Sequence, residues 1–321
     1  MSADKLEKLR RQVSQLDAIS TAPVVLQPLL EILRLPPEAI RFDKVVELVS
    51  YDGAIAAQCL RMANSPLFGH REVETTRAAI MALGLQRVRS MLFGLCMNRV
   101  LPQEKWVFEP VAFWRHSLGC ALVTQRMAQR IGYADPEKAY LAGLLHDLGI
   151  LVNSLLCTED FRKCVERATA ARGPLHVYEA EILGFTHCES GQLLAEHWHL
   201  PADLAQVVQC HHDLEQLGAP SALVCLVHLS DLLCRVRYLG YGYDEVLGVE
   251  LGADLAWQTL VKTHPSLSEM DVARFTMDID GAMDQIVEIV DAVFGGGRQL
   301  QETRAVDSRT TNSGSTTISR G

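Results

Sequence analysis

Apolar residues recur at intervals of three and four positions along most of the chain, and strict alternation of apolar and polar residues is rare. Such spacing gathers apolar side chains on one face of an α-helix, whereas alternation is typical of a half-buried strand. Between Phe42 and Ala63 the pattern predicts two helices that break near Tyr51-Asp52-Gly53, where Asp52 can cap the second helix. Two further helices are predicted over 75–84 and 85–100.

A second helical block is predicted from Pro110 to about Arg237. Glycine and proline interrupt the apolar periodicity there, and both residues are common at helix ends. The predicted starts and stops are Gly132, Gly149, Gly173-Pro174, Gly184, Pro201 and Gly218-Ala219-Pro220. The whole chain is therefore predicted to be all-α.

The pattern weakens towards the end of the chain. Residues 240–275 look less regular, and a final amphipathic helix is predicted from the apolar residues Met283, Ile286, Val287, Val290 and Val293. Gly295-Gly296-Gly297 ends that helix. The last residues are rich in Ser and Thr and poor in aliphatic side chains, so we expect a disordered tail.

The amino-acid composition supports a helical fold and argues against some classes of binding partner. Of 321 residues, 48% are hydrophobic but only 6% aromatic, which favours helices over a sandwich or barrel. The formal charge is −9, which argues against broad binding to nucleic acid or to an anionic membrane. There are nine cysteines, and none form a Cys-x-x-Cys pair. Without a signal-peptide core or a membrane-length apolar run, we expect a cytoplasmic protein with reduced thiols.

Histidine and aspartate residues recur at the ends and inner faces of five successive predicted helices. A bundle can bring side chains from facing helices to one buried point. Neutral imidazole and carboxylate suit Fe, Mn, Zn or Mg, and no cysteine ligand is expected nearby. One or two such metals can lower the pKa of a bridging water, which is the chemistry of a phosphohydrolase. The candidate metal ligands are His116, His146, Asp147, His187, His211, His212 and Asp231.

Each of these residues also has a structural interpretation, in which it only helps to hold the fold together and binds no metal. A single histidine in a helix is more often a hydrogen-bonded core or surface residue than a ligand. The adjacent His146 and Asp147 stand out, because a buried His-Asp pair must find partners. Asp231 is either an inward-facing paired group or part of the polar stripe of its helix. The structural interpretation is kept for His70, His176, His197, His199, His228 and His264.

Three motifs resemble the HDOD branch of the HD superfamily of metal-dependent phosphohydrolases. The run 142–149 contains Leu144-Leu145-His146-Asp147-Leu148-Gly149, which is similar to the HD signature. Upstream lies Leu60-Arg61-Met62-Ala63-Asn64-Ser65-Pro66, followed by Ala79-Ile80 and Leu83-Gly84. Downstream, Glu181 to His187 precedes Trp198-His199-Leu200-Pro201 and His211-His212. The resemblance covers about residues 22–217.

The resemblance implies an N-terminal helical subdomain packed on an HD-like helical bundle, with a C-terminal helical extension. It also implies a bacterial signalling or regulatory role, since HDOD domains are generally viewed as output or scaffold modules. The expected organisation is an N-terminal helical or flexible lead, two parts of the HDOD domain, the extension and a disordered tail. Their bounds are 1–21, 22–102, 103–237, 238–295 and 296–321.

The chain departs from the related HD-GYP phosphodiesterases at three places. Ile150 stands where they carry a lysine after the His-Asp unit, and losing that cation weakens transition-state stabilisation. The paired histidines lead into Asp213-Leu214-Glu215, with no Gly-Tyr-Pro motif behind them. Ala112 occupies the place of a glutamate one turn before the first histidine. All seven candidate ligands nevertheless match the HD-type pattern.

Two functions follow, and the non-catalytic one is preferred. The first is a signalling module that acts mainly through protein contacts, with a divalent metal in the HD-like cleft. The alternative is a metal-dependent phosphodiesterase or phosphohydrolase acting on a nucleotide such as a cyclic dinucleotide. That reaction needs a cation for the phosphate, and Arg115 and Lys138 are the nearest by sequence.

Partners are expected among signalling proteins, and the chain is compatible with a homodimer. The candidate contact surfaces are the helices around Asn64-Ser65-Pro66 and the amphipathic helix Met283–Val293, although ordinary packing explains most single helices. Asn64 before Ser-Pro is also natural turn chemistry. Nucleic-acid binding is not expected, because arginines such as Arg77, Arg87 and Arg89 are typical of solvated helix surfaces.

Overall fold

The computed structural model consists of α-helices and short 3-10 turns, and its described part contains no strand. The described residues are 2–15, 39–51, 53–64, 73–85, 88, 105–237, 239–243, 245–246, 250–264, 267, 281, 283–284 and 286–287. The prediction of an all-α fold is confirmed. The helices are α1 (Ser2–Val13), α3 (Phe42–Tyr51), α4 (Gly53–Ala63), α5 (Thr76–Leu83), α7 (Pro110–Ile131), α8 (Pro136–Leu145), α9 (Leu148–Leu156), α10 (Thr158–Ala171), α11 (Leu175–Ile182), α12 (His187–His197), α13 (Ala202–Cys210), α14 (Ala222–Val236) and α15 (Leu255–Thr263).

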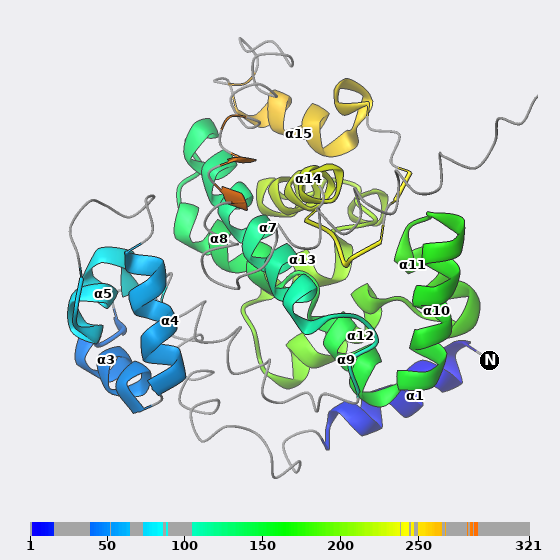
Figure 1. Cartoon of the computed structure of the whole chain (residues 1–321). Helices are drawn as coiled ribbons and strands as arrows, with labels where there is room; N and C mark the ends of the chain where they lie inside the picture. The colour runs from blue at the N-terminus through cyan, green and yellow to red at the C-terminus, as the bar shows by residue number, and fades with distance from the viewer. Residues whose placement is uncertain are drawn as a thin grey trace, which may run out of the picture.

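Helices α3, α4 and α5 pack on one another and form a group beside a larger bundle that begins with α7 (Figure 1). The predicted break between α3 and α4 is confirmed, and α5 begins after Thr75, whose side chain accepts a hydrogen bond from the Ala78 amide. Asn64 joins the end of α4 to Val73, because its side-chain amide exchanges two hydrogen bonds of 2.7 and 2.9 Å with the Val73 backbone. Asn64 is therefore used in turn chemistry.

The larger bundle is built around α7, which packs on α8 and α14. α7 begins at Pro110 and ends at Gly132 in the left-handed conformation, as the sequence predicts. Gly143 allows α8 to approach α7 closely, since a Cβ there would lie 2.8 Å from the Cys120 carbonyl oxygen. This contact brings the end of α8, and His146, next to the middle of α7.

A second close contact joins α9 to α12. A Cβ on Gly149 would lie 1.7 Å from the His187 carbonyl oxygen, and a Cβ on Gly191 would lie 2.9 Å from the Gly149 nitrogen. The two backbones therefore meet with no side chain between them. Gly149 is predicted to mark the start or stop of a helix, and α9 starts one residue before it, at Leu148. The break between α8 and α9 falls at His146-Asp147.

The ends of the described chain also join the bundle. α1 packs on α12 and α9, with Leu9 and Val13 buried. α15 packs on α14, so the stretch that looked irregular in sequence contains a regular helix capped by Asp254. In the final amphipathic segment, Met283 and Ile286 are buried. The predicted cap Asp52, most of the helix over 85–100, Val290, Val293 and the tail 296–321 lie outside the described residues.

One stretch, Pro136–Leu156, is long and apolar enough to cross a membrane by composition alone. It comprises α8 and α9 with the break between them, and 89% of its most apolar window is buried inside the protein. Its hydrophobicity is that of the core of the bundle.

Candidate metal centre

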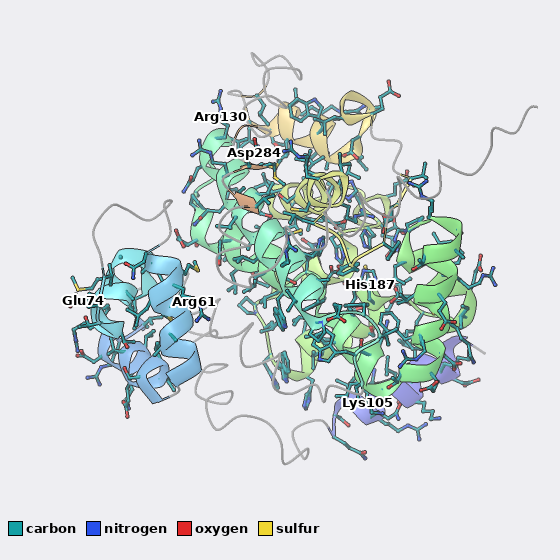
Figure 2. The ribbon with its side chains drawn as sticks, viewed as in Figure 1. Arg61, Glu74, Lys105, Arg130, His187 and Asp284 are labelled. Atoms are coloured by element: carbon teal, nitrogen blue, oxygen red, sulfur yellow. The ribbon has the colours of Figure 1, made fainter. Side chains whose placement is uncertain are left out.

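All seven predicted ligands lie together inside the bundle, but the helices that carry them are not successive, because α10 and α11 come between α9 and α12. His116 lies in the middle of α7, His146 and Asp147 at the junction of α8 and α9, and His187 at the start of α12. His211 and His212 follow α13, and Asp231 lies on α14. Figure 2 shows His187 within the bundle. Six of the seven side chains are at most 2% exposed, and His212 is 11% exposed.

Asp147 lies at the centre of the site. Its Oδ2 is 2.9 Å from His146 Nε2 and 3.3 Å from His116 Nε2. Its Oδ1 is 3.4 Å from both His187 Nε2 and His211 Nε2. One carboxylate thus faces imidazoles from four helices, with a different pair at each oxygen.

The remaining donors divide into two groups around this carboxylate. The first donor group contains His116, His146 and Asp231, and His116 Nε2 is 3.3 Å from both His146 Nε2 and Asp231 Oδ1. The second donor group contains His187, His211 and His212, which together with Asp147 have donor atoms within 4.8 Å of one another. Each group is small enough for its donors to converge on one ion.

Backbone carbonyls orient the imidazoles so that Nε2 faces the centre. The Nδ1–H of His116 donates to Leu239 O at 2.7 Å, and that of His146 donates to Gly143 O at 2.8 Å. The Nδ1–H of His211 is shared between the carbonyls of Val207 and Val208, both at 3.1 Å. A carbonyl only accepts, so Nδ1 must carry the proton in each ring. In the neutral rings, Nε2 then presents a lone pair, as a metal ligand does.

The donors fit a divalent metal. Neutral His116 and His146 would turn two Nε2 lone pairs towards each other at 3.3 Å, which requires a proton or a cation between them. Both oxygens of Asp147 and the Nε2 of His187 are buried without a hydrogen-bond partner. Buried polar atoms are rarely left unpaired, and an ion is one of the few things that satisfies them. The buried His and Asp clusters could therefore bind a metal.

Glu179 is a functional residue that the sequence analysis missed. It is fully buried on α11, and its Oε2 accepts hydrogen bonds from both the Nδ1 and the backbone nitrogen of His187, at 2.6 and 2.9 Å. Its Oε1 accepts a hydrogen bond from Asn153 Nδ2 at 2.9 Å. Glu179 therefore fixes the ring of His187 with Nε2 towards Asp147, as outer carboxylates commonly do for metal-binding histidines.

Arg235 is a second residue that was missed. It lies one turn after Asp231 on α14 and donates to Asp231 Oδ2 at 2.8 Å. Its other terminal nitrogen donates to Glu245 at 2.7 Å, and Glu245 in turn accepts from the Tyr243 hydroxyl. Burial alone would lower the pKa of Arg235, but the two carboxylates outweigh it and raise the pKa. Both terminal nitrogens of the guanidinium are thus engaged by protein carboxylates.

The charges of the site are coupled. Burial disfavours protonation of His116, yet Asp147 and Asp231 outweigh it and raise the pKa of His116 to about 10. Burial also opposes ionisation of Asp147, but the surrounding His146, His116 and His211 hold its pKa well below the usual value. Asp231 behaves in the same way, with Arg235 as the main partner. Ionised carboxylates and proton-binding imidazoles therefore coexist at neutral pH.

The expectation that no cysteine lies near the ligands is wrong. Cys120 Sγ is 3.6 Å from His116 Nε2 and 3.9 Å from its Nδ1, and Cys188 Sγ is 3.8 and 3.9 Å from the two nitrogens of His211. Both thiols therefore lie beside candidate ligand rings. Cys120 Sγ is also close enough to the donor atoms of His116, His146 and Asp231 to join the first donor group.

Two histidines kept under the structural interpretation border the site. The His228 Nδ1 donates to the backbone carbonyl of His211 at 2.7 Å, and its Nε2 lies 3.1 Å from Asp254. The His176 ring stacks on His212 with ring centroids 4.5 Å apart. Both residues support ligands without joining the donor groups.

Neither cation suggested by sequence is seen to serve this site. Lys138 forms an ion pair with Asp203, and it precedes His146 by eight residues on α8, roughly 12 Å along the helix axis. Arg115 immediately precedes His116 on α7, and its side chain is partly buried. Arg235 is the cation that contacts a candidate ligand directly.

Comparison with known proteins agrees with this architecture. A crystal structure of an HDOD domain protein of unknown function from Geobacter sulfurreducens matches with a TM-score of 0.74 and 26% identity, covering 91% of this chain and 99% of that one. A protein from Marinobacter aquaeolei VT8, provisionally named as a signal transduction protein, matches with a TM-score of 0.68 and 19% identity, over 91% of this chain and 65% of that one.

A curated relative shows the same partial overlap. An uncharacterised protein from Treponema pallidum (strain Nichols) is 27% identical over 201 residues, which is 62% of this chain and 39% of the relative. The chain thus spans well under half the length of that protein. The HDOD domain family itself matches residues 19–214, which contain six of the seven candidate ligands. The chain therefore belongs to the HDOD domain family.

Proposed function

We propose that this protein is a metal-binding regulatory HDOD module that acts through protein contacts and does not hydrolyse a phosphate ester. The observation that carries the proposal is the pairing of a complete ligand set with near-total burial. Six ligands are at most 2% exposed, and the guanidinium that contacts Asp231 is committed to Asp231 and Glu245. A phosphohydrolase needs an accessible metal and a cation for the phosphate.

The donors favour a transition metal over Mg. Five of the seven candidate ligands are imidazoles, which suit Zn, Fe and similar ions, whereas Mg prefers oxygen ligands and keeps several waters. When bound, such an ion would neutralise Asp147 and Asp231 and could polarise a coordinated water. Glu179, Arg235 and the backbone carbonyls hold the candidate metal ligands in place. These ligands come from five helices, so bound metal would join all five. Metal loading would therefore stabilise one arrangement of the bundle and of the surfaces it presents.

A metal-dependent phosphohydrolase is the second candidate. One observation favours it: Asp147 turns one oxygen to each donor group, and a carboxylate between two metals is typical of two-metal hydrolytic sites. Both proposed functions require a bound metal, but only the phosphohydrolase would hydrolyse a phosphate ester.

The deciding experiment combines elemental analysis with an activity assay. Protein purified without chelator or affinity tag should contain about one to two equivalents of Fe, Mn or Zn, and Asp147→Ala should contain almost none. Asp160→Ala, which removes an exposed carboxylate elsewhere, is the matched control and should retain the metal. Loaded protein should not hydrolyse bis(p-nitrophenyl) phosphate or a cyclic dinucleotide above the Asp147→Ala background. Turnover that Asp147→Ala abolishes would establish the phosphohydrolase instead, and absence of metal after reconstitution would reject both candidates.

A further inference from the structure

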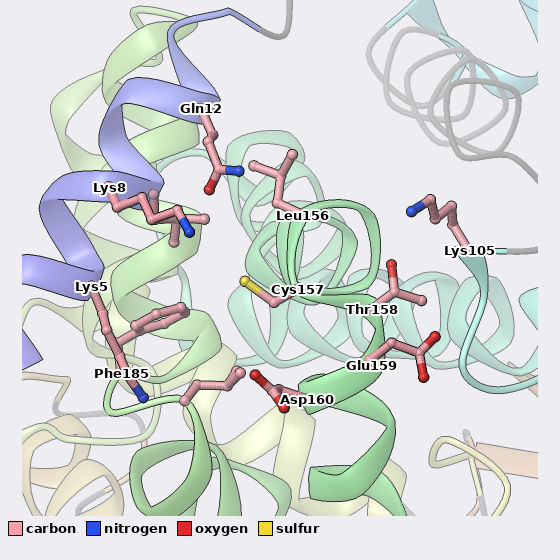
Figure 3. Close-up of a pocket in the computed structure, with 12 residues that line it drawn as sticks. Lys5, Lys8, Gln12, Lys105, Leu156, Cys157, Thr158, Glu159, Asp160 and Phe185 are labelled. Atoms are coloured by element: carbon pink, nitrogen blue, oxygen red, sulfur yellow. The ribbon is translucent and has the colours of Figure 1, made fainter.

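A cavity of about 450 Å³ lies between α1, the start of α10 and the loop that joins α11 to α12. Figure 3 shows Lys8 and Gln12 approaching it from α1, with Lys105 on the opposite side. None of its lining residues is one of the seven candidate metal ligands. Cavities of 300–1,000 Å³ are the usual size of small-molecule sites.

The cavity is lined by three lysines, one of which, Lys5, donates a hydrogen bond to the Ile182 carbonyl oxygen. Lys5, Lys8 and Lys105 contribute three positive charges, and neither Lys8 nor Lys105 forms an ion pair with any residue in the described ranges. Two acidic residues, Glu159 and Asp160, also line it, but Asp160 accepts a hydrogen bond from Lys163 at 2.7 Å. The balance is positive in a chain whose formal charge is −9.

The inner wall is apolar. Leu9, Leu183 and Phe185 line the cavity and are each at most 4% exposed. No side chain caps the start of the 14-residue α10, so its free amide nitrogens offset part of the negative charge of Glu159 and Asp160 in its first turn. Lysines at the rim and an aromatic wall together suit a ligand with an anionic group and an apolar ring.

We propose that this cavity binds a small phosphorylated organic molecule of the size of a nucleoside monophosphate. Lys8 and Lys105 contact its phosphate from opposite sides, and its ring packs towards Phe185. The HDOD match begins at residue 19, so α1, which supplies Lys5, Lys8 and Gln12, precedes the matched segment.

The cavity adjoins two segments that connect to the metal centre. One leads to His187 of the second donor group, and the other follows Asp147, the central carboxylate. Phe185 lies two residues before His187, and Leu156 ends α9, whose first turn follows Asp147. A bound phosphate ester therefore contacts elements that also position the metal ligands, although binding itself does not depend on the metal.

Isothermal titration with AMP tests the proposal, with adenosine and inorganic phosphate as comparison probes. AMP should bind with a 1:1 stoichiometry and more tightly than either comparison probe. The double variant Lys8→Gln/Lys105→Gln should weaken AMP binding at least tenfold, whereas Lys262→Gln, an exposed lysine on α15, should leave it unchanged. Equal thermal unfolding midpoints would show that all three proteins are folded.

The same titration on Asp147→Ala separates this site from the metal centre. Retained AMP binding supports a site of its own, even if the metal centre fails its own test. AMP binding lost with Asp147, unchanged in the double lysine variant or undetectable in the wild type would overturn the proposal. Inorganic phosphate binding as tightly as AMP would overturn the assignment of an organic ligand.

Discussion

Glu179 has no exposed surface and uses both carboxylate oxygens, one for Asn153 and one for His187. Replacing it with glutamine keeps the shape but removes the charge and puts an NH₂ group where one oxygen accepts a hydrogen bond. The ring of His187 then loses its fixed orientation towards Asp147. We predict that Glu179→Gln weakens metal binding by about 10- to 100-fold, the usual cost of losing an outer-shell partner. Competition with a chromophoric chelator would measure this change.

Glu181→Gln is the matched control. Glu181 lies two residues further along the same helix, and its side chain is 53% exposed, with only a 3.5 Å ion pair to Arg167. Exposed pairs of this kind contribute little to stability or position. If both variants bound metal equally well, the orienting role of Glu179 would be disproved.

Individual residues differ in how far the sequence predicts them. Four of the seven candidate ligands could be predicted because His146-Asp147 and His211-His212 stand in motifs whose neighbours resemble the pattern of a known family. Arg235 left a weaker signal, its spacing of four residues from Asp231 on one helix. The sequence gives no sign of the role of Glu179, because its partner His187 lies on the next helix and only the turn between the two helices brings them together.

At the scale of helices, the close contact between α9 and α12 means that adding a single methyl group there should strongly lower the stability of the fold. A methyl group at Gly149 would overlap the His187 carbonyl and approach the Gly191 nitrogen, both of which are backbone atoms that cannot rotate away. We predict that Gly149→Ala lowers the free energy of unfolding by at least about 3 kcal/mol, the upper end of the cost of overpacking. Urea denaturation followed by circular dichroism would measure the loss.

The control for this variant is Gly252→Ala, where an added Cβ would meet no atom within 4 Å. That change should alter the free energy of unfolding by less than about 1 kcal/mol. An unchanged unfolding midpoint for Gly149→Ala would mean that the two helices lie further apart than this structure places them.

Helix boundaries were predicted best where local chemistry decides them. Gly132 ends α7, Pro201 precedes α13, and Gly173-Pro174 separates α10 from α11, since each acts through its own backbone preference. The bounds of α15 within the predicted helical extension 238–295, and the exact place of the break between α8 and α9, were not predicted. Both depend on packing against α7, α12 or α14, which no window of sequence contains.

For the whole molecule, folding brings charged aspartate and histidine side chains together in the buried site. In the unfolded chain these side chains are exposed to water, so the stability of the fold depends on pH. Asp147 and Asp231 have lowered pKa values, so the folding free energy that they contribute is present above about pH 4 and is lost as the pH falls below it. His116 and His211 have raised pKa values of about 10 without metal. Their contribution is complete below about pH 6.5 and is lost as the pH rises towards 10.

The same raised pKa values make metal binding a competition with protons. At neutral pH the metal-free site holds protons on His116, His187 and His211, whose pKa values are all raised, and a proton must leave each ring before its Nε2 can bind an ion. We predict that metal binding releases protons from these rings and that metal affinity rises between pH 6 and 9 by about tenfold per pH unit for each proton released. Calorimetric titration of Zn²⁺ in buffers of different ionisation enthalpy counts those protons, with Asp147→Ala as the variant that should give no binding heat. An affinity independent of pH, with no proton released, would mean that the imidazoles are already neutral and that a neutral hydrogen-bonded core, without imidazolium, holds the five helices together.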